Sequence, residues 1–134
     1  MDWDGLVLNN LRIFEVDLME VTFTPLSMVK GNTKYVQIKM VGLDTALEGA
    51  YFTVKTSLDD ENPLFQKTLS DGITQDTGDE EVYTVRVAPE DTASLPDLDL
   101  PAVQYWYDFT IEADGDVYTP LIGTLDVVKG TTEV

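Results

Sequence analysis

The chain has 134 residues, enough for one domain with a core of useful size, and 43% of them are hydrophobic, which is too many for a wholly disordered protein. Twenty-five acidic residues against eight basic ones give a formal net charge of −17, which repels phosphate backbones and anionic membranes and argues against nucleic-acid and membrane partners. There is no cysteine and no histidine, which excludes disulfides, thiolate nucleophiles, Cys/His zinc sites and histidine acid–base catalysis. We therefore expect no catalytic residue and no cofactor.

The first 28 residues leave two interpretations open. Residues 1–10 carry Trp3, Leu6 and Leu8 with no sustained period, which is typical either of an arm that packs on a neighbouring subunit or of a short first strand. The same residues lack the positive charge and long apolar run of a signal peptide or membrane span. Residues 11–20 come close to alternation and predict a strand. Residues 21–24 continue it up to Pro25, which cannot donate to a ladder.

Alternating apolar residues then predict a series of strands separated by turns. The turn at 30–33 precedes a strand at 35–41, in which Val36, Ile38 and Met40 face the core. Further strands are expected at 50–56, 64–69 and 82–87. Residues 70–81 are polar, acidic and rich in turn formers, so we expect a loop there. Residues 88–95 predict one or two turns of helix, because Pro89 suits the first helical position and acidic residues follow it.

The clearest pattern is the hairpin at residues 105–128. Tyr105, Tyr107, Phe109 and Ile111 alternate with polar residues and with Trp106, which places the two groups on opposite faces of a strand. Two residues between the arms, Asp114-Gly115, suit a type I′ turn.

About seven short strands with one short helix predict an all-β, immunoglobulin-like antiparallel β-sandwich, with a small barrel as the competing architecture. Its expected organisation is residues 1–28 as an arm or first strands, possibly part of the sandwich, residues 29–128 as the sandwich domain, and residues 129–134 as a polar tail.

Acidic loops are the one place where a cation site is conceivable. Asp59, Asp60 and Glu61 form one group, Asp114 and Asp116 another, and residues 76–81 carry a third. None has the spacing of an EF-hand loop, so we expect no metal site. These groups remain weak calcium candidates, and the simpler interpretation is that they are solvent-exposed loop residues. Trp106 is the aromatic residue of the hairpin expected outside the core, and with Trp3, Leu6 and Leu8 it forms the predicted interface set.

Several short motifs resemble small structural proteins of tailed bacteriophages and prophages. In chain order they are FTVK at 52–55, SLDD at 57–60, PL at 63–64, QKT at 66–68, APEDTASL at 88–95, YWYD at 105–108, VYTPL at 117–121 and GTL at 123–125. The chain is similar, over about residues 29–128, to the amino-terminal immunoglobulin-like domain of phage upper baseplate proteins. In that family a Lys-Gly-Asp-Thr turn opens the domain, and here Asn32 replaces the Asp.

The resemblance implies a virion component made in the bacterial host cytoplasm, without enzymatic activity, that acts as an assembly or adaptor module in a baseplate, tail, neck or capsid surface. Its partners would be other virion subunits, and it would be oligomeric in the particle. The alternative is a carbohydrate-binding or adhesin-type β-sandwich module, possibly calcium-dependent, using Trp106 or loop aromatics.

Overall fold

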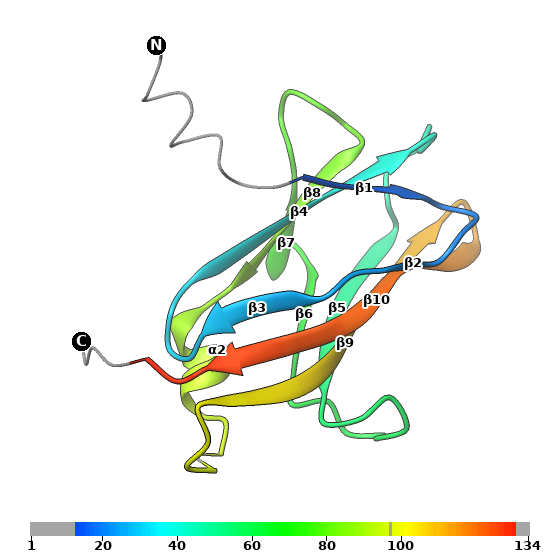
Figure 1. Ribbon diagram of the computed structural model, residues 1–134. Helices are drawn as coiled ribbons and strands as arrows, with labels where there is room; N and C mark the ends of the chain where they lie inside the picture. The colour runs from blue at the N-terminus through cyan, green and yellow to red at the C-terminus, as the bar shows by residue number, and fades with distance from the viewer. Residues whose placement is uncertain (1–12, 97, 131–134) are drawn as a thin grey trace.

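The computed structural model describes residues 13–96 and 98–130, and the chain there forms a single hydrogen-bonded system of ten strands with one short helix (Figure 1). The elements are β1 (Ile13–Asp17), β2 (Thr22–Phe23), β3 (Leu26–Val29), β4 (Lys34–Val41), β5 (Gly49–Lys55), β6 (Phe65–Leu69), β7 (Gly72–Gln75), β8 (Val82–Val87), α2 (Pro89–Ala93), β9 (Ala102–Ala113) and β10 (Asp116–Val128).

The strand order is that of an immunoglobulin-like sandwich. One layer runs β1-β4-β8-β7 and the other runs β6-β5-β9-β10, with β2 and β3 beside β10. These are the two sheets expected for such a domain, with the β6 strand added to the second sheet. A two-residue parallel pairing between β6 and β7 joins the layers, so the sandwich is continuous and barrel-like. The predicted fold class is therefore confirmed, with more strands than the seven expected.

The core lies between the layers and comes from the alternating residues that the sequence singles out. Val36, Ile38 and Met40 of β4 are fully buried, as predicted. On the opposite layer Phe52 stacks on Tyr107 with ring centroids 5.3 Å apart. Asp114 and Gly115 both have positive φ, 53° and 83°, so the turn of the β9–β10 hairpin is of the predicted type.

Two strands were missed by the sequence analysis. Residues 70–81, expected to be a loop, contain β7, which pairs with β8 and buries Ile73 completely. The segment after Pro25 forms β3, which runs parallel to β10, and Figure 1 shows the two ribbons side by side. Residues 13–29 thus supply three strands of the sandwich.

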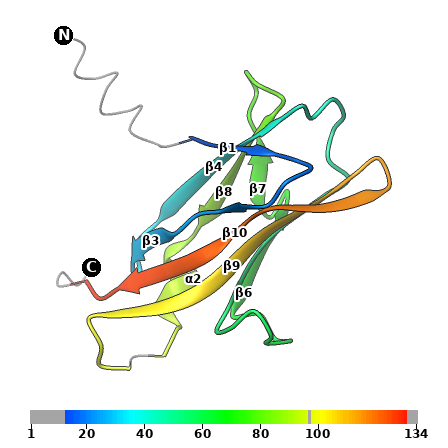
Figure 2. The same ribbon diagram turned by 45° about the vertical axis from the view of Figure 1, so that its right-hand side comes forward.

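The N-terminal strands cover both outer edges of the sheet system. β1 runs parallel to β4, the chain turns at residues 18–21, and β2 and β3 then run parallel to β10 (Figure 2). A strand edge without a partner invites pairing with another chain, so this arrangement protects β4 and β10. The free edges of the described sheet therefore belong to short strands.

The crossing from β2 to β3 is held by an unusually close approach to β10. Thr24 N–H donates to the carbonyl of Ile122 at 3.0 Å, and the Tyr107 hydroxyl donates to the carbonyl of Thr24 at 2.8 Å. Burial raises the pKa of the Tyr107 phenol, which keeps it protonated as a donor. Gly123 of β10 lies against the Thr24 carbonyl, and a Cβ atom at position 123 would collide with that carbonyl. The crossover fits only because position 123 has no side chain.

The helix α2 connects three separate parts of the chain. Asp91 accepts a hydrogen bond from Ala88 N–H at 2.7 Å, which caps the helix, and forms an ion pair with Lys67 of β6 at 2.6 Å. Thr92, which is fully buried, accepts a hydrogen bond from Gly31 N–H in the turn before β4 at 2.8 Å. α2 therefore joins β6 to the turn between β3 and β4.

Candidate functional site

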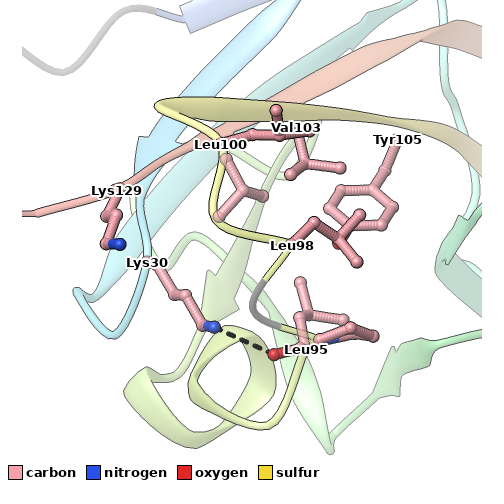
Figure 3. Close-up of a pocket in the computed structure, with 9 residues that line it drawn as sticks. Lys30, Leu95, Leu98, Leu100, Val103, Tyr105 and Lys129 are labelled. Carbon is pink, nitrogen blue, oxygen red and sulfur yellow. Dashed lines mark hydrogen bonds between the residues drawn. The ribbon is translucent and has the colours of Figure 1, made fainter.

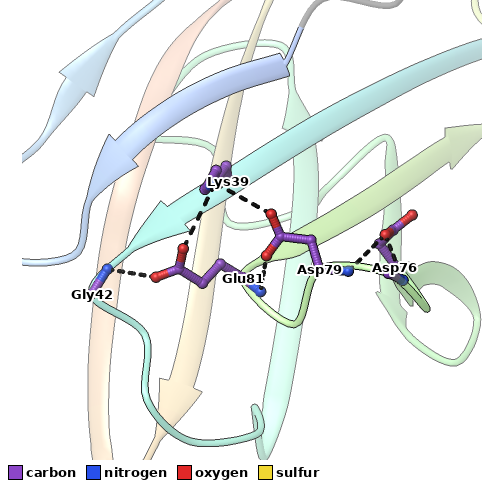
Figure 4. Close-up of polar contacts among 6 residues, drawn as sticks. Lys39, Gly42, Asp76, Asp79 and Glu81 are labelled. Atoms are coloured by element: carbon purple, nitrogen blue, oxygen red, sulfur yellow. Dashed lines mark hydrogen bonds and ion pairs between the residues drawn. The ribbon is translucent and has the colours of Figure 1, made fainter.

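The acidic residues 76–81 serve the structure of a turn. Asp76 accepts hydrogen bonds from Gly78 and Asp79 N–H, both at 2.9 Å. Asp79 and Glu81 flank the amino group of Lys39 at 3.2 and 3.9 Å, and Glu81 also accepts from Gly42 N–H (Figure 4). The hydrogen bond from Glu81 N–H and the contact with Lys39 lower the pKa of Asp79, while Asp79 raises the pKa of Lys39. These carboxylates are thus engaged with protein donors.

The calcium candidates stay dispersed. Asp59, Asp60 and Glu61 lie in the β5–β6 connection, where Asp60 accepts from Asn62 N–H, and Asp114 and Asp116 lie at the β9–β10 turn. Within residues 13–96 and 98–130, no three acidic side chains come together in a way that could hold a metal ion.

An apolar pocket lies beneath the connection between α2 and β9. Leu95, Leu98, Leu100, Val103 and Tyr105 point toward one another there, and the Lys30 amino group donates to the carbonyl of Leu95 at 2.9 Å (Figure 3). Its volume is about 60 Å³, well below the ~300–1,000 Å³ typical of small-molecule sites. The pocket is therefore too small for a ligand of that size.

A larger, polar groove lies on the outward face of the β6-β5-β9 layer. Its floor is a row of neighbours across three strands, in which Gln66 of β6 opposes Thr53 of β5, and Thr53 opposes Asp108 of β9. Lys55 and Glu61 are among its other lining residues, and its volume is about 330 Å³. We call it the Asp108 groove. It has the size of a small-molecule site, and it is open to solvent.

Asp108 is the most unusual group in this groove. It is half-buried, and burial raises the pKa of its carboxyl, partly offset by the hydroxyl of Thr110 and the charge of Lys55. Among the described residues the one hydrogen-bond donor to it is the Thr110 hydroxyl, at the long distance of 3.4 Å. A partly desolvated carboxylate with a single weak donor is poised to accept hydrogen bonds from outside the chain.

The raised pKa gives a prediction about stability. Ionisation of Asp108 costs the folded state more than the unfolded state, so stability declines as pH rises through the folded-state pKa. Asp108→Asn removes that cost, so we expect a higher Tm than wild type near neutral pH, and no gain at about pH 3, where the carboxyl is protonated in both states. Thermal unfolding of both proteins over this range checks it. A gain that does not depend on pH would contradict the argument.

Trp106 lies on the same outward face, as predicted, but it is partly covered. The ring of Phe23 from β2 meets it edge-on, with centroids 6.2 Å apart and an interplanar angle of 81°. The other predicted interface residues, Trp3, Leu6 and Leu8, lie outside the described residues. The sequence did not predict the Asp108 groove, because nothing in the local sequence around Thr53 or Gln66 indicates a binding site. The one feature that could have indicated it is the acidic Asp108 within a strand rich in aromatic residues.

The N-terminal strands and the turn between them carry a group of exposed apolar side chains. Ile13 of β1 is 48% exposed, Met19 78%, Val21 63% and Phe23 of β2 64%. They are close in sequence, on β1, β2 and the turn between them. We call these four residues the β1–β2 strip. Exposed apolar side chains that gather in one segment of a chain are candidates for contacts with another protein.

No protein-family model matches the chain, and no curated protein sequence does. Among solved structures it is similar to the NK cell receptor Nkp44, with 18% identity, a TM-score of 0.47, and coverage of 81% of this chain and 99% of that one. It is also similar to the swine CD8aa homodimer, with 10% identity, a TM-score of 0.45, and coverage of 82% and 96%. No helix in the described part of the chain has the length and apolar character needed to cross a membrane.

Proposed function

We propose that the chain is a non-enzymatic structural protein of a tailed phage or prophage particle, and that it works as an assembly module. The observation that carries the proposal is the β1–β2 strip, which presents four exposed apolar side chains at one end of the described chain. The resemblance of residues 29–128 to phage baseplate proteins supplies the biological setting. Other virion subunits, including further copies of this chain, are the proposed partners.

The strip suits a contact between proteins for two reasons. Burial of its apolar side chains favours association by roughly 25 cal/mol per Å² of apolar area removed from water. Its strands also lie at the edges of the sheet system, where a neighbouring strand can add by backbone hydrogen bonds. Residues 1–12, which precede the strip, add Trp3, Leu6 and Leu8 in the sequence.

The charge of the chain favours selective contacts over general aggregation. At a net charge of −17, copies repel one another wherever no specific surface compensates. Assembly through an apolar strip should therefore tighten as salt screens the repulsion.

The test compares the full chain with Val21→Ser/Phe23→Ser by light scattering at several concentrations and salt levels. We expect a defined oligomer for the wild type and a monomer, or at least a tenfold weaker association, for the double variant, since two exposed apolar side chains contribute about 1–2 kcal/mol or more at an interface. The control Leu58→Ser removes an apolar side chain of similar exposure from the β5–β6 connection, and it should leave the mass unchanged.

The biological setting has its own test. Particles purified from the bacterium that encodes the chain, after induction of its prophages, should contain the protein in stoichiometric amounts by mass spectrometry. Its absence from particles that contain the neighbouring structural gene products would overturn the virion assignment, whatever its mass in solution.

A further inference from the structure

We propose that the Asp108 groove binds a neutral sugar. This site is separate from the β1–β2 strip and goes beyond the assembly role. The groove is lined by side chains of both hydrogen-bonding kinds, because Lys55 and Gln66 donate while Asp108 and Glu61 accept. Thr53 adds a hydroxyl that can do either.

This mixture distinguishes a polyhydroxyl ligand from a cation. Each hydroxyl of a sugar both donates and accepts, so it can use a carboxylate and an ammonium group within one site. A guanidinium or ammonium ligand only donates, so it would leave the Lys55 ammonium group without an acceptor. Among the described residues Lys55 forms no ion pair, so its amino group is available to a ligand.

The site is held in shape by hydrogen bonds on both sides of Asp108. Gln66 donates from its amide to the Thr53 hydroxyl at 2.9 Å, which fixes the side of the groove formed by β5 and β6. The hydroxyls of Thr110 and Thr119 share a hydrogen bond of 2.9 Å, which fixes the side formed by β9 and β10. A rigid strand platform loses little conformational entropy on binding.

One aromatic ring and the net charge of the chain further limit which sugars the groove could bind. Tyr51 lines the groove, and its hydroxyl donates to the Glu112 carboxylate at 2.7 Å, which fixes the orientation of the ring. The net charge of −17 disfavours acidic sugars such as uronic or sialic acids. A neutral hexose or N-acetylhexosamine unit fits both constraints.

The experiment is an NMR titration of the isotope-labelled full chain with glucose, galactose, N-acetylglucosamine and maltose, and separately with arginine. We expect saturable shifts of the β5 and β9 amides around Thr53 and Asp108 with at least one sugar. Asp108→Asn and Gln66→Ala should each weaken that binding about tenfold, since a hydrogen bond to a desolvated group is lost. Asp126→Asn, on the same face of β10, should leave the affinity unchanged.

Three results would overturn the proposal: no saturable shift with any of the four sugars, shifts centred away from the groove, or saturable binding of arginine alone. Asp108→Asn is expected to be at least as stable as the wild type near neutral pH, so its lost binding cannot be attributed to unfolding. The strip variant Val21→Ser/Phe23→Ser should keep the sugar affinity, which separates failure of this site from failure of the assembly role.

Discussion

Gly123→Ala should destabilise the protein by roughly 3 kcal/mol, because overpacking a buried position against rigid backbone costs at least the ~1–3 kcal/mol of ordinary overpacking. The added methyl group would collide with the carbonyl of Thr24, and the Tyr107 ring lies within 3.0 Å on another side. Backbone has no rotamer to change, so the β2–β3 crossover must move away from β10. That movement stretches the hydrogen bonds that Thr24 makes to Ile122 and Tyr107. Urea unfolding followed by circular dichroism measures the loss.

Gly78→Ala is the matched control for this substitution. A Cβ at Gly78 meets Asp76 at 3.4 Å, which is ordinary van der Waals contact. We expect its free energy of unfolding to stay within about 0.5 kcal/mol of the wild type, as for most surface substitutions. If both variants unfold at the same urea concentration, the crossover is not held as described.

Asp91→Ala should have the second large effect, a loss of about 3 kcal/mol, because breaking a buried ion pair leaves an uncompensated charge. Both partners are largely buried, with side-chain exposures of 16% for Lys67 and 13% for Asp91. The substitution also removes the acceptor for Ala88 N–H at the start of α2. The helix would then lose its link to β6, and equilibrium denaturation measures the loss.

Two further variants separate these contributions. Lys67→Met removes the ion pair but leaves Asp91 capping the helix, so it should cost less than Asp91→Ala. Glu90→Ala, at the exposed neighbouring position in the same helical turn, should cost only a few tenths of a kcal/mol. A larger loss for Lys67→Met than for Asp91→Ala would contradict this order and would show that the unpaired Asp91 carboxylate costs more than the cap contributes.

Much of the fold follows from the sequence wherever alternation is long enough to fix a strand. β4, β5, β8 and the β9–β10 hairpin each show apolar residues at every second position, and the structure buries these residues. The helix could also be predicted from the sequence, because Pro89 and the acidic residues after it are typical of the start of a helix.

The missed strands have few residues and depend on distant partners. β7 has one buried apolar residue, Ile73, and it begins at Gly72, whose φ of 101° is typical of a turn. β3 is four residues long, and its partner β10 lies at the other end of the chain. Local patterns carry no information about such pairing, because it is set by tertiary contacts.

The same limit applies to the candidate sites. Asp108, Thr53 and Gln66 come from three strands, and only the pairing register places them in one row. The prediction that Trp106 faces outward followed from alternation alone, whereas its cover by Phe23 required the crossover of β2. The motifs on which the proposed phage role rests gave no hint of the groove.

The pairing of β2 and β3 with β10 also sets the order in which the chain can fold. The β9–β10 hairpin is local and can close quickly, whereas β2 and β3 can pair only after β10 has been made. During synthesis β2 and β3 therefore leave the ribosome long before β10 exists, with Phe23 exposed and the edges of both strands unpaired. The strongly negative net charge of the chain reduces aggregation of this unpaired segment, because incomplete copies repel one another.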